Sequence, residues 1–239
     1  MQATTKKLLL PVLLTLCAAP LAIQDPVSPQ PLDAPRVGLG AGLTQAQIAA
    51  LSAIRVNPFD GTTLMSPAEE RQLANWIGRP FDGFELAFRK TTDGATSSAF
   101  HTAVDDLGPT VTVIQLANGV VFGGYNPAGW TSLSSYNGSA EGEGFLFSFH
   151  SGKRFPYGST DADRLVYDHP SYGPTFGGGH DFYINSTLDL QYTNFPFDYS
   201  WQGTNKAPTD AACQELTGLD RLVSSPITEL EVWVLEGVL

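Results

Sequence analysis

The chain has 239 residues and a formal net charge of −11, with 13 Lys and Arg residues against 24 Asp and Glu residues. This acidic balance argues against a nucleic-acid-binding protein and against docking on anionic lipid, because both need clustered cations. Aromatic residues make up 11% of the chain, which excludes wholesale disorder. The two cysteines are too few for a disulfide-rich scaffold.

The first 22 residues have the pattern of a secretory signal peptide. Lys6 and Lys7 precede an apolar run over Leu8–Leu16, and small residues follow it as far as Ala22. The run is shorter than the roughly 20 apolar residues that a membrane-spanning helix needs. We therefore expect residues 1–22 to be removed and the mature protein to be secreted or periplasmic, without membrane insertion. The alternative is a buried N-terminal helix.

Removal of this segment changes the charge and the cysteine count together. The segment contains Lys6 and Lys7 and no acidic residue, so its loss lowers the formal charge from −11 to −13. It also contains Cys17, which leaves Cys213 alone and excludes an internal disulfide. Cys17 follows Leu16, where a lipoprotein signal needs a small residue, so a lipid anchor is less favoured than secretion.

The mature chain is predicted to divide into a linker, a helical lead-in and one main domain. Residues 23–43 contain four prolines and little hydrophobic pattern, which is typical of an extended tether. Residues 44–78 carry two helix patterns. Residues 79–239 carry the strand patterns and form the predicted main domain.

The two lead-in helices are expected from their N-terminal signals. The first begins at Thr44, in a Thr-Gln-Ala-Gln capping box. The second begins at Ser66, where Glu69 completes a capping box and Pro67 suits the first helical position. Gly78 is expected to end the second helix.

Strand patterns dominate the rest of the chain. The expected strands are Phe84–Arg89, Thr110–Leu116, Val120–Tyr125, Phe145–Phe149, Arg164–Tyr167, Asp181–Ile184 and Ile227–Leu235. Asn118-Gly119 predicts a hairpin between the second and third of these, and a helix is expected over Ser98–Leu107. Short strands with helices grouped early predict an α+β fold, built on a two-sheet antiparallel β-sandwich flanked by a few short helices.

Five stretches in this order resemble the TLDc domain family. They are Phe84–Arg89 with Asp93-Gly94 and Phe100-His101, then Gly108–Ile114, Val121–Tyr125 with Gly123 and Gly124, Phe145–Phe149, and Gly173–Ile184 with Gly177, Gly178 and Gly179, followed by Glu229–Trp233. The resemblance implies a β-sandwich of two antiparallel sheets. It also implies roles that are linked to oxidative stress and to binding the vacuolar proton pump. It supplies no catalytic residues. Pump binding is doubtful for a chain that a signal peptide takes out of the cytosol.

The His–Asp pairs are the first candidates for chemistry. His180-Asp181 and Asp168-His169 combine a histidine with a carboxylate, as metal sites and acid–base pairs do. Neighbouring residues of a strand point to opposite faces, so His180 and Asp181 are not expected to face one site if the strand has begun. No histidine spacing matches a known zinc motif, so ordinary loop hydrogen bonding is the simpler interpretation.

Two acidic residues of the last strand are the second candidates. Glu229 and Glu231 share one strand face with Trp233, and the alternate residues are expected to form the core face. Ion pairing with Arg89 or Arg164 is the structural interpretation, and a binding or acid–base role is the functional one.

Glycines and loop aromatics allow both structural and binding interpretations. Gly177-Gly178-Gly179 has the composition of an anion-binding nest, but a bulge or sharp turn is favoured. Gly123 and Gly124 indicate close approach of sheets. Four further aromatic residues lie in expected loops: Trp130, Tyr136, Tyr199 and Trp201. They are suited either to binding a sugar or a protein or to covering an edge of the sandwich.

Two classes of function follow. The first is an exported, non-enzymatic binding or stress-protective module with an unknown protein or glycan partner and no cofactor. The second is an exported hydrolase or glycan-active protein that uses His180 and Asp181 with Glu229 or Glu231. Convergence of these side chains in an open cleft would favour the second class, because catalysis requires geometry first.

Overall fold

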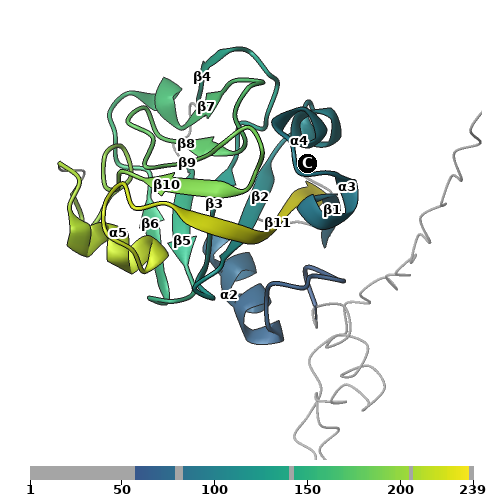
Figure 1. Ribbon diagram of the computed structural model, residues 1–239, viewed down its shortest axis with the longest axis horizontal. Coiled ribbons are helices and arrows are strands. Elements are labelled where there is room, and N and C mark those ends of the chain that lie inside the picture. Colours follow the sequence, from purple (N-terminus) through teal and green to yellow (C-terminus); the bar gives the residue numbers. More distant parts are fainter. Residues whose placement is uncertain (1–56, 79–82, 140–142, 205–206, 237–239) are drawn as a thin grey trace, which may run out of the picture. The chain divides into compact units, whose positions relative to one another are not determined.

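The described part of the chain is mainly antiparallel β-structure with a few short helices (Figure 1). The structure is a computed structural model that describes residues 57–78, 83–139, 143–204 and 207–236. These residues belong to one unit, residues 44–239. The expected signal peptide, the linker and the helix beginning at Thr44 lie outside the described residues.

The helices and strands have the following bounds. The helices are α2 (Pro67–Ile77), α3 (Lys90–Asp93), α4 (Ser97–Val104) and α5 (Asp210–Thr217), with the 3₁₀ helix η1 (Ala162–Arg164). The strands are β1 (Gly83–Arg89), β2 (Thr110–Leu116), β3 (Val121–Asn126), β4 (Ser135–Asn137), β5 (Phe145–Ser148), β6 (Lys153–Pro156), β7 (Val166–Asp168), β8 (Thr175–Phe176), β9 (Phe182–Ile184), β10 (Leu190–Thr193) and β11 (Ser225–Glu236). Within the described residues no helix is long and apolar enough to span a membrane.

Hydrogen bonding joins the eleven described strands in the order β4-β7-β8-β9-β10-β11-β2-β3-β5-β6, with β1 on β11. The α+β prediction is therefore confirmed, but the predicted division into two separate sheets is not. The reason is the length of β11, whose first residues Ser225 and Pro226 pair with Gln191 and Leu190 of β10. The rest of β11 pairs with β1 and β2.

We call β1, β11, β2, β3, β5 and β6 the β11 group, and β4, β7, β8, β9 and β10 the β9 group. The two groups meet through their side chains. The Phe122 ring of β3 lies 5.2 Å from the Phe182 ring of β9, and a Cβ on Gly124 of β3 would collide with the Phe176 ring of β8. The close approach expected at Gly124 is thus made by an aromatic ring.

The local signals for α2 act as expected. The Ser66 hydroxyl accepts from the Glu69 backbone N–H, and the Glu69 carboxylate accepts from the Ser66 N–H at 2.8 Å, which completes the capping box. Gly78 ends the helix with a left-handed φ of 67°. The expected hairpin between β2 and β3 is also confirmed, with Gly119 at a φ of 83°.

Several elements were not among the predicted strands and helices. They are β10, α5 and the short strands β4, β6 and β8. Helix α5 has ordinary terminal signals: the Thr209 hydroxyl accepts from the Ala212 N–H, and Gly218 ends the helix. These signals were available in the sequence.

Two hydrophobic clusters cover opposite faces of the β11 group. The larger one lies against the β9 group and includes Phe122, Val232 and Phe182. The second contains Trp233 together with Phe59 and residues of α2 such as Leu73, and Figure 1 shows α2 beside the β11 group. Trp233 was expected on a face without core residues, but it is fully buried, because residues 57–77 fold over that face.

Candidate functional site

Glu231 is a buried hydrogen-bond centre. Its carboxylate accepts from the Thr62 hydroxyl at 2.7 Å, from the Thr63 N–H at 2.9 Å and hydroxyl at 3.0 Å, and from the Trp233 indole at 3.2 Å. Arg89 donates from Nη2 at 2.8 Å and from Nε at 3.2 Å. Burial alone raises the pKa of Glu231, but the bonds from Thr62, Thr63 and Arg89 outweigh it and hold the pKa below its ordinary value.

Glu229 is only half-buried and has a different set of partners. Its carboxylate accepts from the Thr91 N–H at 3.2 Å, from the Thr91 hydroxyl and from the Leu230 N–H at 3.0 Å. The second expected cationic partner, Arg164, is paired with Asp161 at 2.7 Å instead. The two glutamates of β11 therefore act separately.

Asp181 is fully buried and binds a loop. Its carboxylate accepts three backbone N–H groups in succession, from Phe197 at 2.6 Å, Asp198 at 3.0 Å and Tyr199 at 3.4 Å. Burial raises the pKa of Asp181 to about 7, against the lowering effect of these donors. The neighbouring Asp198 carboxylate adds to the rise, whereas Glu231 has Arg89 beside it.

The triple glycine before Asp181 serves the same loop. Gly177 has a left-handed φ of 83°, and a Cβ there would collide with the Asp181 carboxylate. The Gly178 N–H donates to the carboxylate of Asp198. An amide that an anion-binding nest would present to a ligand is thus used by a carboxylate of the chain itself.

His180 lies on the other side of the backbone from Asp181. Its ring contacts Tyr167 at 5.3 Å, Tyr183 at 5.6 Å and Tyr172 at 6.2 Å. Burial lowers the pKa of His180, which favours the neutral form of the ring. Within the described residues, the hydrogen-bond partners of Asp181 and those of Glu231 do not overlap, and the structure does not bring the four predicted candidates together.

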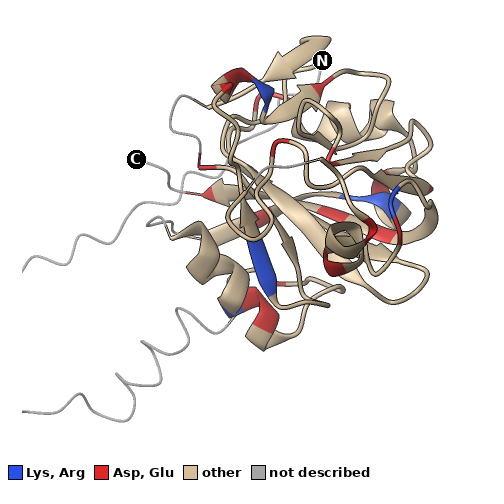
Figure 2. Cartoon of the chain, turned by 90° about the vertical axis from the view of Figure 1, so that its left-hand side faces the viewer, with Lys and Arg blue, Asp and Glu red and all other residues tan. Residues whose placement is uncertain are grey.

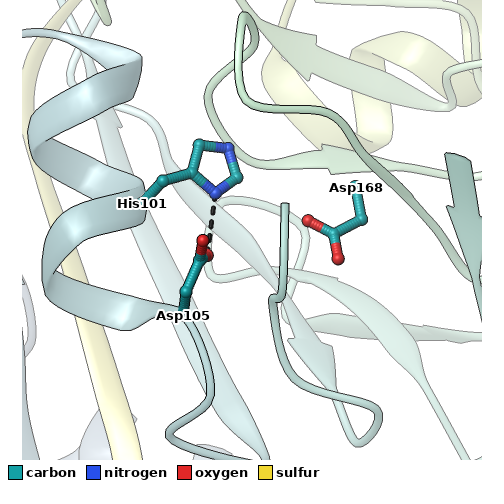
Figure 3. A group of neighbouring side chains, drawn as sticks. All are labelled: His101, Asp105 and Asp168. Carbon is teal, nitrogen blue, oxygen red and sulfur yellow. Dashed lines mark hydrogen bonds and ion pairs between the residues drawn. The ribbon is translucent and has the colours of Figure 1, made fainter. Parts of the chain in front are cut away.

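A cluster that the sequence analysis missed joins α4 to β7. His101 of α4, Asp105 after α4 and Asp168 of β7 place one ligand-type atom each within 4.8 Å of one another (Figure 3). His101 Nδ1 lies 2.8 Å from the Asp105 carboxylate. The signal available in the sequence was the four-residue spacing of His101 and Asp105 at the end of a predicted helix, which puts both on one side.

Every polar atom of this cluster already has a partner. The Nδ1 atom of His101 contacts Asp105, and its Nε2 atom lies 3.2 Å from the His169 carbonyl oxygen and 3.1 Å from the Tyr172 carbonyl oxygen. Both ring nitrogens therefore face oxygen atoms. Asp168 accepts from the Thr131 N–H and hydroxyl and from the Ser132 N–H, and Asp105 accepts from the Ser132 hydroxyl.

The cluster is better explained as a hydrogen-bond network than as a metal centre. A metal needs a deprotonated ring nitrogen, and here both nitrogens of His101 face oxygen atoms that accept hydrogen bonds. The network fixes the turn at residues 169–172, because His101 bonds its first and last carbonyl groups.

A row of rings covers one face of the β9 group. Strand residues alternate between fully buried and half-buried, with Phe182 and Ile184 inside and Tyr183 outside in β9. We call the outer set the aromatic face; it comprises Tyr136, Tyr167, His169, Tyr172, His180, Tyr183 and Tyr192, all half-buried.

The rings of the aromatic face form a continuous chain of contacts. Ring centroids are 5.0 Å apart for Tyr136 and Tyr167, 5.3 Å for Tyr167 and His180, 5.6 Å for His180 and Tyr183, and 4.9 Å for Tyr183 and Tyr192. Tyr136 stands opposite Tyr167, and Tyr183 opposite Tyr192, in the strand register. Such cross-strand pairs hold their rings in place.

Of the four loop aromatics singled out in the sequence, one belongs to this face. Tyr136 lies on it and donates its hydroxyl to the Gly178 carbonyl at 2.9 Å. Trp130 and Tyr199 are fully buried, and Trp201 is half-buried with its indole bonded to Glu215 at 2.8 Å. The interpretation as covering residues holds for Trp130 and Tyr199.

Two surface hollows, of about 260 and 300 Å³, lie elsewhere on the described chain. The first is lined by Asn118 and His150 among others, the second by Trp76 and Arg154 among others. Neither is lined by His180, Asp181, Glu229, Glu231 or a member of the aromatic face.

Comparison with known proteins supports the resemblance seen in the motifs. The model of the TLDc domain matches residues 59–236, which is most of the chain. A search of curated proteins found no match. The matched range contains β1 to β11 and α2, and with them the two hydrophobic clusters and the aromatic face. This chain therefore belongs to the TLDc domain family.

Proposed function

We propose that the chain is an exported, non-enzymatic binding module of the TLDc family whose binding surface is the aromatic face. The observation that carries the proposal is the continuous row of half-buried Tyr and His rings over the outer side of the β9 group. The rings remain partly accessible to solvent, and a contiguous, partly accessible aromatic surface is typical of an interaction site.

The state of the candidate acids weighs against the hydrolase alternative. A general base needs a free lone pair within reach of a substrate. The carboxylates of Asp181 and Glu231 are fully buried, and each has both oxygens hydrogen-bonded within the chain. His180 packs instead against the rings of Tyr167, Tyr172 and Tyr183. We therefore assign these groups to holding loops and strands in place.

A protective role based on a thiol is not part of the proposal. Cys213 is fully buried, and burial raises the pKa of its thiol to about 11. Because the thiolate is the reactive form of cysteine, this thiol is unsuited to redox chemistry in the folded protein. Any stress-protective role would have to come from what the module binds.

Export rests on the N-terminal pattern of Lys6, Lys7 and the apolar run that follows them. N-terminal sequencing of the protein from its own source tests this part. We expect the exported fraction to contain a chain that begins near residue 23. An intact chain starting at Met1 and found only in the cytosol would contradict export.

Binding is tested with the mature protein immobilised and exposed to the exported fraction of its source. We expect one macromolecule, protein or polysaccharide, to be retained by the wild type and lost by the Tyr167→Ser/Tyr183→Ser double variant. The matched control is Trp76→Ser, which removes a half-buried ring stacked on Phe149, away from the aromatic face. Equal retention by the wild type and the double variant would contradict the assignment of the surface.

A further inference from the structure

We propose that the aromatic face binds an uncharged glycan chain. This inference rests on the proposed binding function and names the ligand of the same surface. Its support comes from the charge of the face, the state of its polar atoms, its length and the way one of its turns is held.

The aromatic face contains no Asp, Glu, Lys or Arg residue. Its members are tyrosines and two histidines, and burial lowers the pKa of His180, which favours its neutral form. The cation at one end, Arg164, lies 5.6 Å from the Tyr136 ring and is paired with Asp161. The carboxylates nearest in sequence, Asp168 and Asp181, are fully buried and hydrogen-bonded.

An uncharged ligand is the best match to this surface. The chain as a whole has a charge of −11, and Figure 2 shows acidic residues on several sides of it, so an anionic polymer would be repelled. A cationic partner would find no carboxylate on the face with which to pair. A neutral ligand is not repelled by the acidic chain and needs no carboxylate to pair with.

The polar edges of the rings favour a ligand rich in hydroxyl groups. Among the described residues, the hydroxyls of Tyr167, Tyr172, Tyr183 and Tyr192 and the ring nitrogens of His180 make no hydrogen bond. An apolar protein surface would bury these groups without partners, which costs free energy. Sugar hydroxyls both donate and accept, so they can pair with tyrosine hydroxyls and a neutral imidazole alike.

The ring orientation supports the same conclusion. Tyr183 and Tyr192 are stacked with an interplanar angle of 11°, and Tyr167 and His169 with 14°. Stacked neighbours cover each other's faces and leave their edges for a ligand. The ring edges carry the tyrosine hydroxyl groups and the histidine nitrogen atoms. A ligand that contacts the edges therefore meets these polar groups, with C–H groups of the rings between them.

The extent of the face indicates a chain of several sugars. The row runs from Tyr136 of β4 to Tyr192 of β10, across β7, β8 and β9. With neighbouring strands about 4.8 Å apart, the row spans about 19 Å. A single monosaccharide would occupy only part of this length.

His101 is a positioning residue for this face. It bonds the carbonyls of His169 and Tyr172 and so fixes the turn that carries both rings. The Tyr172 ring in turn contacts Tyr167 at 5.7 Å and Tyr183 at 6.0 Å. A surface whose rings are held in advance loses less conformational entropy when a ligand binds.

Affinity electrophoresis of the mature protein tests the proposal. The neutral probes are xyloglucan, galactomannan and a soluble β-1,3-glucan, and alginate is the anionic control. For any polysaccharide that binds, the affinity is then measured by titration with its oligosaccharides. We expect at least one neutral probe to retard the wild type and alginate to leave its mobility unchanged. Tyr183→Ser is expected to weaken binding about tenfold, because it removes one ring contact together with the hydrogen bond of its hydroxyl.

Two further variants serve as comparisons. One measures the contribution of the Tyr183 hydroxyl apart from that of its ring, and the other removes a ring that lies outside the aromatic face. Tyr183→Phe keeps the ring and is expected to weaken binding about threefold, in line with one neutral hydrogen bond. Trp76→Ser is expected to bind as the wild type does. Thermal melting of each variant establishes that it is folded before its binding is compared.

The outcomes distinguish this inference from the function on which it rests. Retention of a protein partner that needs Tyr167 and Tyr183, with no binding to any neutral probe, would overturn the glycan proposal and leave the binding surface intact. Equal binding to alginate would overturn the charge argument. If neither glycan nor protein is retained through these residues, both proposals are wrong.

Discussion

The β11 group and the β9 group differ in how far their polar and aromatic side chains are buried and hydrogen-bonded. The β11 group is covered on both faces, and its central acid, Glu231, has every oxygen bonded to a residue of the chain. The β9 group is covered on one face only, and its other face leaves tyrosine hydroxyls without partners among the described residues. Satisfied polar groups hold a fold together, whereas unsatisfied ones at the surface are available to a ligand.

The two buried acids show a second difference between the groups. Glu231 has Arg89 as a cationic partner, and its pKa lies below the ordinary value despite burial. Asp181 has only backbone donors, and burial raises its pKa to about 7. The donors around Glu231, two threonines and Arg89, outweigh its burial, whereas the backbone donors around Asp181 do not. The predictions below test both differences.

The largest effect is expected at Glu231. Glu231→Ala leaves the Thr62 and Thr63 hydroxyls without their acceptor and Arg89 without its anionic partner, so we expect the free energy of unfolding to fall by about 3–5 kcal/mol. Urea unfolding of the purified variants measures this. Glu229→Ala is the matched control on the same strand and should cost no more than about 1 kcal/mol. A cost at Glu231 as small as that at Glu229 would contradict its structural role.

An effect of similar size is expected from the titration of Asp181. Its folded pKa of about 7 lies above the ordinary value, so its contribution to stability is complete below about pH 4 and is lost as the pH rises through 7. A shift of about three units corresponds to about 4 kcal/mol. Asp181→Asn removes this dependence. Unfolding measured from pH 4 to 8 should show wild type losing stability relative to the variant, and parallel curves would refute the assignment.

A smaller effect is expected at His101. His101→Ala removes the ring contacts to the carbonyls of His169 and Tyr172 and to the Asp105 carboxylate, of which His169 and Asp105 each keep one other donor, so we expect a loss of about 2 kcal/mol. The wild-type protein should melt at the same temperature with and without EDTA, because the cluster is explained by hydrogen bonds alone. A marked fall of the melting temperature in EDTA would identify the cluster as a metal centre.

The smallest effect on stability is expected at the aromatic face. Tyr183→Ser removes a half-buried ring whose hydroxyl has no partner among the described residues, so the free energy of unfolding should change by only about 1 kcal/mol. Thermal or urea unfolding measures it. A loss as large as that of Glu231→Ala would mean that Tyr183 belongs to the core.

Local signals explain which parts of the fold were predictable. The capping residues Ser66 and Glu69 and the turn Asn118-Gly119 act within a few positions of the chain, so they identified α2 and the hairpin of β2 and β3. The cover over Trp233 comes from Phe59 and α2, which are far from it in the sequence. Strand alternation cannot show whether a second layer covers the outer face.

The candidate site was less predictable for the same reason. Arg89 was identified as one possible partner of Glu231. His180 and Asp181 lie just before β9, so strand alternation does not determine where their side chains point. The aromatic face was missed because its rings come from separate strands and turns, and only the strand order β4-β7-β8-β9-β10 brings them together. No spacing in the sequence reveals that order.

The most direct test of the account compares binding and stability in the same two variants. Retention on the neutral probe that binds the wild type is measured for Tyr183→Ser and for Glu229→Ala, alongside their unfolding free energies. We predict that Tyr183→Ser loses about tenfold in affinity and that Glu229→Ala loses none, while both remain within about 1 kcal/mol of the wild type. Unchanged affinity in a folded Tyr183→Ser protein would contradict the assignment of the aromatic face as the binding surface.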